Sequence, residues 1–124
     1  MDRREYHRFR GSLECNIYFK NRDIDYKEFS GLIEDISEVG LRIKIDTKDN
    51  VDFVNNITVG DSIMFQSAEE KQIHNEEKIT VLIGEARVLR IEEEKEFIKI
   101  GCAIVSVIPE YYKYIRYREM QIFR

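Results

Sequence analysis

The chain has 124 residues, of which 43% are hydrophobic and 11% aromatic, so we expect one folded domain with a single core rather than a disordered segment. The net charge is −4, and residues 1–10 and 109–124 carry +2 each, which leaves −8 for the residues between them. An acidic middle repels extended polyanions, so general DNA or RNA binding is disfavoured, whereas capture of a small anion at the basic N-terminus is allowed.

Apolar and polar residues alternate over several short segments, a pattern typical of half-buried strands. Polar or charged residues dominate 46–60 and 67–78, which we expect to be exposed connections. Pro109 is placed to begin a C-terminal helix over 109–123. The order predicts a mainly β fold, a small six-stranded antiparallel barrel over 12–107 followed by that helix. Strands are expected near 13–19, 29–35, 41–45, 63–65, 79–91 and 97–107.

The first ten residues hold four arginines, Arg3, Arg4, Arg8 and Arg10. On a regular strand these side chains would point in different directions, so the cluster suits a loop that folds around a ligand. We therefore assign residues 1–11 to a mobile, arginine-rich loop. Guanidinium groups match phosphate oxygens and the O6/N7 edge of guanine. The alternative is a solvated basic terminus without a ligand.

A second motif, D-x-S-x-x-G, is formed by Asp35, Ser37 and Gly40 between two predicted strands. A carboxylate accepts hydrogen bonds from the edge of guanine opposite to the one that arginine reads. We expect Gly40 to take a positive φ in this turn. Alone, the motif is equally compatible with a plain turn in which Asp35 and Ser37 bond the local backbone.

Taken together, the two motifs resemble those of the PilZ family, bacterial receptor domains for cyclic di-GMP. The R-x-x-x-R motif of that family is matched by Arg4 and Arg8, and its [D/N]-x-S-x-x-G motif by Asp35, Ser37 and Gly40. Family members have an arginine-bearing N-terminal loop, a six-stranded barrel and a C-terminal helix, and the predicted elements follow that order over nearly the whole chain.

The resemblance implies a role for each matched residue. Arg4 and Arg8 would bind the phosphates and the Hoogsteen edge of guanine, and Asp35 would accept from a guanine N–H. Ser37 would bond the ligand or orient Asp35, and Gly40 would allow close backbone approach. An arginine before the first motif, here Arg3, favours an intercalated pair of ligand molecules in similar proteins.

The implied function is a switch that performs no chemistry. Cyclic di-GMP would order the N-terminal loop over the barrel, and the change would be read by an unidentified downstream protein. No cofactor is expected, and the chain can be a monomer or a dimer. The rival interpretation is an adaptor that binds proteins on the same barrel without nucleotide, although retention of all five motif residues favours the receptor.

Other functions find less support. His7, Ser37 and Asp35 are the ingredients of a hydrolase triad, but no G-x-S-x-G elbow surrounds Ser37, so we expect no enzyme. The two histidines, His7 and His74, lack metal-ligand spacing.

The compartment and the terminal helix give two further expectations. Cys15 and Cys102 are isolated, which favours buried free thiols in a reducing compartment. No apolar stretch spans a membrane and no signal peptide is visible, so we expect a cytoplasmic protein. The predicted helix carries several tyrosines that either pack on the barrel or bind a partner; they are Tyr111, Tyr112, Tyr114 and Tyr117.

Overall fold

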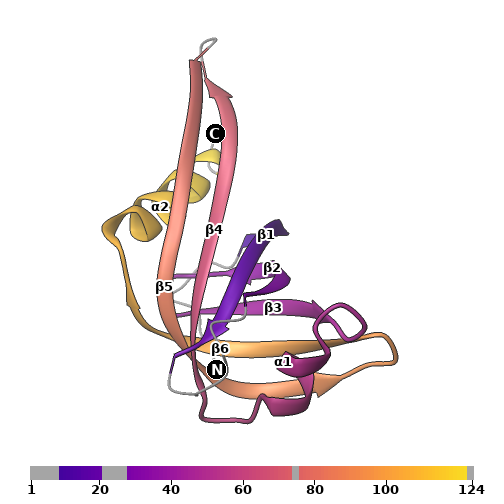
Figure 1. The fold of residues 1–124 in the computed structure, drawn as a ribbon. Helices are drawn as coiled ribbons and strands as arrows, with labels where there is room; N and C mark the ends of the chain where they lie inside the picture. The colour runs from indigo at the N-terminus through magenta and orange to yellow at the C-terminus, as the bar shows by residue number, and fades with distance from the viewer. Residues whose placement is uncertain (1–8, 21–27, 74–75, 123–124) are drawn as a thin grey trace.

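The computed structural model describes residues 9–20, 28–73 and 76–122. Six antiparallel strands form a closed barrel in the order β1-β2-β3-β6-β5-β4, in which β4 pairs with β1. The predicted fold class, a six-stranded antiparallel barrel with a C-terminal helix, is confirmed (Figure 1). The elements are β1 Phe9–Phe19, β2 Phe29–Ile36, β3 Gly40–Asp46, α1 Val51–Asn56, β4 Ser62–Ile73, β5 Glu76–Glu93, β6 Phe97–Val107 and α2 Pro109–Ile122.

The core follows directly from strand alternation. In β3, Leu41, Ile43 and Ile45 point into the barrel and are buried, whereas Arg42 and Lys44 point outward. The other strands contribute isoleucine-rich inner faces in the same way. A closed sheet leaves no free edge within the barrel itself, and its interior is filled by side chains. The fully buried strand residues include Ile17, Ile43, Ile45, Ile63, Phe65, Leu82, Ala86, Val88 and Ile100.

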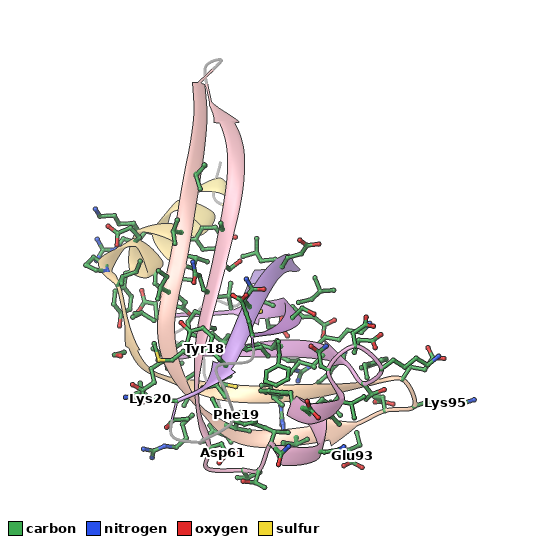
Figure 2. The ribbon with its side chains drawn as sticks, in the orientation of Figure 1. Tyr18, Phe19, Lys20, Asp61, Glu93 and Lys95 are labelled. Carbon is green, nitrogen blue, oxygen red and sulfur yellow. The ribbon has the colours of Figure 1, made fainter. Side chains whose placement is uncertain are left out.

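The first helix, α1, closes the barrel at the end where β3 finishes. Phe53 of α1 is fully buried and stacks on Phe19 of β1, with ring centroids 4.9 Å apart, and it also contacts Phe29 of β2 at 5.2 Å. The position of Phe19 at this end is visible in Figure 2. The buried Asn50 amide joins the helix to the sheet, because its Oδ1 accepts from the Ser30 N–H at 3.0 Å.

The second helix, α2, closes the barrel at the end where β3 begins and lies against β5 (Figure 1). Tyr111, Tyr114 and Ile115 are its buried residues, and Tyr111 packs against Phe65 of β4 with ring centroids 6.2 Å apart. Tyr112, by contrast, is 41% exposed. The packing interpretation of the tyrosines therefore holds for Tyr111 and Tyr114.

Two segments that we expected to be exposed connections contain regular structure. Residues 51–56 of the first form α1. In the second, β4 continues to Ile73 and β5 begins at Glu76, so the two strands extend past the others as a two-stranded ribbon (Figure 1). The sequence did not reveal this ribbon because residues 67–78 are mostly charged or polar and lack the apolar alternation that marks the barrel strands.

Other expectations concern the N-terminal boundary, the thiols and the membrane. The sequence places residues 9–11 in the N-terminal loop, whereas β1 begins at Phe9. Cys15 and Cys102 are free and buried, as predicted. Within the described parts of the chain, no helix has the length and hydropathy needed to cross a bilayer.

Candidate functional site

The D-x-S-x-x-G motif forms the turn between β2 and β3, and Ser37 holds this turn closed. Its backbone N–H donates to the Gly40 carbonyl at 2.9 Å. Its Oγ accepts from the N–H groups of Val39 and Gly40 at 3.3 and 3.1 Å and donates to the Gly40 carbonyl at 3.2 Å. A hydroxyl has one donor and two acceptor positions, so these bonds occupy the whole side chain.

Gly40 serves this turn by its small size and not by its backbone angle. Gly60 is the glycine with positive φ among the described residues, so the expected positive φ at Gly40 is wrong. A Cβ on Gly40 would stand 2.7 Å from the carbonyl oxygen of Cys102 on β6. The motif glycine therefore allows β3 and β6 to approach closely just where β3 begins.

Asp35 lies on the outer face of the barrel, in a row of residues that runs across neighbouring strands. Asp35 of β2 pairs with Arg42 of β3, Arg42 pairs with Gly101 of β6, and Gly101 pairs with Arg90 of β5. The side chain of Arg90 lies over Gly101. Its Nε and Nη2 atoms are each 3.7 Å from the position that a Cβ on Gly101 would occupy. One carboxylate and two guanidinium groups thus share one strip of the surface.

The carboxylate of Asp35 has no hydrogen-bond or ion-pair partner within the described part of the chain. Its neighbour Glu34, by contrast, forms an ion pair with Lys99 at 3.1 Å. Arg90 contacts Glu92, with 3.3 Å between Nε and Oε1, and its side chain is 61% exposed. A half-buried carboxylate without a partner retains acceptor positions for a ligand.

A pocket of about 600 Å³ opens over this strip. The motif turn supplies one wall with Asp35, Ser37, Val39 and Gly40, and the remaining wall and floor come from β3, β5 and β6. Val39 and Leu89 stand at its rim, 49% and 58% exposed. The pocket therefore combines exposed apolar side chains with one anionic and two cationic groups. Its other lining residues are Ile36, Leu41, Arg42, Leu89, Arg90, Gly101, Cys102 and Ala103.

Of the lining residues, the sequence predicted only Asp35, Ser37 and Gly40 as site residues; those it missed include Arg42, Leu89, Arg90 and Gly101. Alternation marks Arg42 as outward-facing, two residues after Gly40, and would have found it. Gly101 reaches the site through the pairing of β3 with β6, which joins residues about sixty positions apart, and Arg90 reaches it through the pairing of β6 with β5. The strand register shifts between Val88 and Arg90, which leaves Leu89 as an extra residue, and such bulges commonly redirect a side chain.

The three arginines predicted for the site, Arg3, Arg4 and Arg8, lie outside the described residues. The structure does show where the chain that follows them joins the sheet. Phe9 pairs with Ile36 and Arg10 pairs with Asp35, so β1 starts beside the motif. No group of three or more His, Cys, Asp or Glu side chains in the described ranges is arranged to hold a metal ion.

These features define a small closed β-barrel module with a mixed-charge pocket on its outer surface, built on the D-x-S-x-x-G turn. The chain matches the PilZ domain model over residues 2–117, and it belongs to the PilZ domain family. The resemblance seen in the sequence is thereby confirmed. The comparison with curated protein sequences gave no match.

Two solved structures have the same fold. The inhibitor of motility (MotI/DgrA) of Bacillus subtilis superposes with a TM-score of 0.71 at 20% identity, over 100% of this chain and 54% of that one. The PilZ domain with c-di-GMP of YcgR from Escherichia coli superposes with a TM-score of 0.65 at 13% identity, over 93% of this chain and 87% of that one. This chain thus spans about half the length of the Bacillus protein.

Proposed function

We propose that this chain is a receptor for cyclic di-GMP that binds the nucleotide at the motif pocket and signals to a partner protein without performing chemistry. The observation that carries the proposal is the Asp35 carboxylate, which faces the pocket without a partner among the described residues, in one row with Arg42 and Arg90. A guanine base offers N–H donors on one edge and O6/N7 acceptors on the other, and phosphates accept from guanidinium groups.

The size and lining of the pocket agree with such a ligand. Small-molecule sites generally enclose about 300–1,000 Å³ and combine apolar walls with a few polar groups. Here Val39, Leu89 and Ala103 offer apolar surface for the face of a purine, beside the three charged side chains. The YcgR domain, which shares the fold, is a PilZ domain solved with c-di-GMP.

The N-terminal arginines complete the proposed site. β1 begins at Phe9, directly after the R-x-x-x-R motif in the sequence, and Arg10 pairs with Asp35, which lines the pocket. We assign to Arg4 and Arg8 the phosphates and the Hoogsteen edge of guanine, and to Arg3 the choice of a ligand pair. Residues 1–8 would fold over the pocket when ligand binds, which gives a ligand-dependent surface for the partner.

The hydrogen bonds of Ser37 support binding rather than catalysis. Its Oγ donates to the Gly40 carbonyl, which is not a general base, and accepts from two backbone N–H groups. We therefore assign to Ser37 the shaping of the turn that presents Asp35, and not the role of a nucleophile.

Calorimetric titration with cyclic di-GMP tests the proposal, with a matched control for each charge. Asp35→Asn is paired with Asp49→Asn, which changes an exposed aspartate in the turn before α1. Arg8→Ala is paired with Lys95→Ala, at the far tip of the β5–β6 hairpin (Figure 2). We expect the wild type to bind, and Asp35→Asn and Arg8→Ala to weaken binding by about tenfold to a hundredfold, since each removes a base- or phosphate-specific contact.

The outcomes separate the parts of the proposal. Absence of binding by the wild type at low salt would overturn the receptor function and favour the nucleotide-independent adaptor. Removal of a negative charge by itself favours an anionic ligand, so equal loss in Asp35→Asn and Asp49→Asn would overturn the specific role of the Asp35 carboxylate. A stoichiometry of a single ligand would remove only the role given to Arg3.

A further inference from the structure

A direct hydrogen bond joins the C-terminal helix to the ligand-binding turn. The hydroxyl of Tyr111, in the first turn of α2, donates to the backbone carbonyl of Ser37 at 2.5 Å, across 74 residues of sequence. Ser37 is the central residue of the D-x-S-x-x-G turn, and Tyr111 belongs to neither motif.

The hydrogen bond from Tyr111 is made to Ser37, the residue whose side chain also holds the turn closed. The side-chain Oγ of Ser37 accepts hydrogen bonds from the N–H groups of Val39 and Gly40. Its backbone carbonyl accepts from the Tyr111 hydroxyl. The turn is also bonded to β6, since the Val39 carbonyl accepts from the Ile104 N–H at 2.9 Å. Because Asp35 lies near the end of β2, only two residues before Ser37, fixing the Ser37 peptide also restrains the direction from which Asp35 enters the pocket.

Tyr111 is itself rigidly placed. Its side chain is fully buried, its ring contacts Phe65 edge-on, and Tyr112 lies across it with ring centroids 5.8 Å apart. The start of α2 is bonded to the sheet, since the Ile108 N–H donates to the Ile83 carbonyl of β5 at 3.1 Å. Burial, assisted by Tyr112 and Glu38, raises the pKa of Tyr111 well above its usual range, so the hydroxyl keeps the proton that it donates.

We propose that Tyr111 is a positioning residue for the ligand site, through which docking of α2 holds the motif turn in the shape that binds ligand. The proposal rests on the proposed function, because the ligand is the cyclic dinucleotide of that site. Binding free energies are reciprocal, so the same bond makes ligand occupancy strengthen the docking of α2 on the barrel. The pocket and the C-terminal helix are thereby coupled, although no described side chain of α2 lines the pocket.

Tyr111→Phe is the variant that tests the coupling, because it removes the hydroxyl and retains the ring contacts. Tyr112→Phe is the matched control, since it removes a hydroxyl from the adjacent residue of the same helix, which is exposed. We expect Tyr111→Phe to weaken cyclic di-GMP binding by about threefold to thirtyfold, as for the loss of one buried hydrogen bond, and Tyr112→Phe to leave it unchanged.

Amide hydrogen exchange supplies a readout that loss of packing alone would not move. In ligand-free Tyr111→Phe, the Val39 and Gly40 amides should exchange faster than in the wild type. Saturating cyclic di-GMP should slow exchange of the α2 amides over 112–116 in the wild type and in Tyr112→Phe, but not in Tyr111→Phe. Thermal unfolding of each variant establishes that the protein measured is folded.

The failures of the two proposals are distinguishable. If the wild type binds and Tyr111→Phe matches it in affinity and in exchange at the turn, the positioning role is overturned and the receptor function stands. Equal weakening in both tyrosine variants overturns it as well, since a general effect of the helix would then suffice. If the wild type itself does not bind, the receptor function fails, and the role of Tyr111 toward the ligand fails with it.

Discussion

The two ends of the barrel are closed by different means. At the end where β3 finishes, Phe19, Phe29 and Phe53 form an aromatic cluster with centroid distances of 4.9 to 6.2 Å. At the end where β3 begins, Tyr111 of α2 fills the same structural role but adds a hydroxyl that bonds the Ser37 carbonyl. Phe53, which closes the α1 end, has a wholly apolar side chain, whereas Tyr111, which closes the α2 end, carries one polar atom, its hydroxyl oxygen.

The hydroxyl of Tyr111 gives the α2 end a contact with the ligand-binding turn that the α1 end lacks among the described residues. The α1 end contributes burial, and the side chain of its buried Asn50 bonds, among the described residues, to the Asp46 carbonyl of its own turn and to Ser30. The α2 end contributes burial and also contacts the turn that lines the pocket. We therefore expect changes at the α1 end to alter stability alone, and changes at the α2 end to alter stability and ligand binding together.

Removal of the Phe53 side chain should have the largest effect on stability. Phe53→Ala leaves a cavity among Phe19 and Phe29, and we expect the free energy of unfolding to fall by about 3–5 kcal/mol. The affinity of the folded protein for cyclic di-GMP should stay within about twofold, because the sites are distant. Urea denaturation and calorimetry check both parts, and Phe53→Leu serves as a milder variant that retains most of the packing. A large loss of affinity in Phe53→Leu would remove the distinction between the two ends.

Alkaline pH should lower the stability of the barrel. Burial raises the pKa of Cys15 from 9.0 to about 12, and burial, with a contribution from Cys15, raises that of Cys102 to about 12. The folded state therefore keeps protons that the unfolded state has lost, so the stabilisation is complete below pH 9 and falls as the pH rises from 9 to 12. At pH 10 the two thiols together should cost about 2–3 kcal/mol of unfolding free energy.

Urea denaturation at pH 8 and pH 10 measures this loss. Cys15→Ala and Cys102→Ala should each have a shallower pH dependence than the wild type, whatever their absolute stability. An unchanged dependence in both variants would show that neither thiol is the source.

Two glycine substitutions, each of which adds a single methyl group, test whether the motif turn requires close approach of β3 and β6. Gly40→Ala places a methyl group against the Cys102 carbonyl oxygen, so β3 must move away from β6. We expect a loss of about 1–2 kcal/mol in unfolding free energy, together with weaker ligand binding. The control is Gly101→Ala on β6, where the nearest atoms lie at 3.7 Å in ordinary contact, and it should change stability by about 0.5 kcal/mol or less. Equal losses in the two variants would mean that glycine acts at Gly40 through strand propensity and not through close approach.

Local sequence patterns were sufficient to predict most of the fold. Alternation in residues such as Leu41, Ile43 and Ile45 marked the strands, and Pro109 marked the start of α2. The helix α1 was missed because six residues with two asparagines carry little periodic signal, and its stability comes from burial of Phe53. The β4–β5 ribbon was missed because the sequence over 67–78 is mostly charged or polar and shows no apolar alternation.

The candidate site was predictable only where it is local in sequence. Asp35, Ser37 and Gly40 were found from one short motif, yet the reason for Gly40 is its contact with Cys102, sixty-two positions away. Arg90, Gly101 and Tyr111 belong to the site through strand pairing and helix docking, which no spacing in the sequence reveals.

The most direct test of the account is the map of amide chemical-shift changes that cyclic di-GMP causes in the isotope-labelled protein. We predict that the changes concentrate at the motif turn, at Leu89 and Arg90, at residues 101–103 and in the first turn of α2, and that residues 51–56 of α1 remain unchanged. Shifts centred on α1, or no shifts at saturating ligand, would contradict the claim that the pocket and the Tyr111 end of the barrel form one ligand-responsive unit.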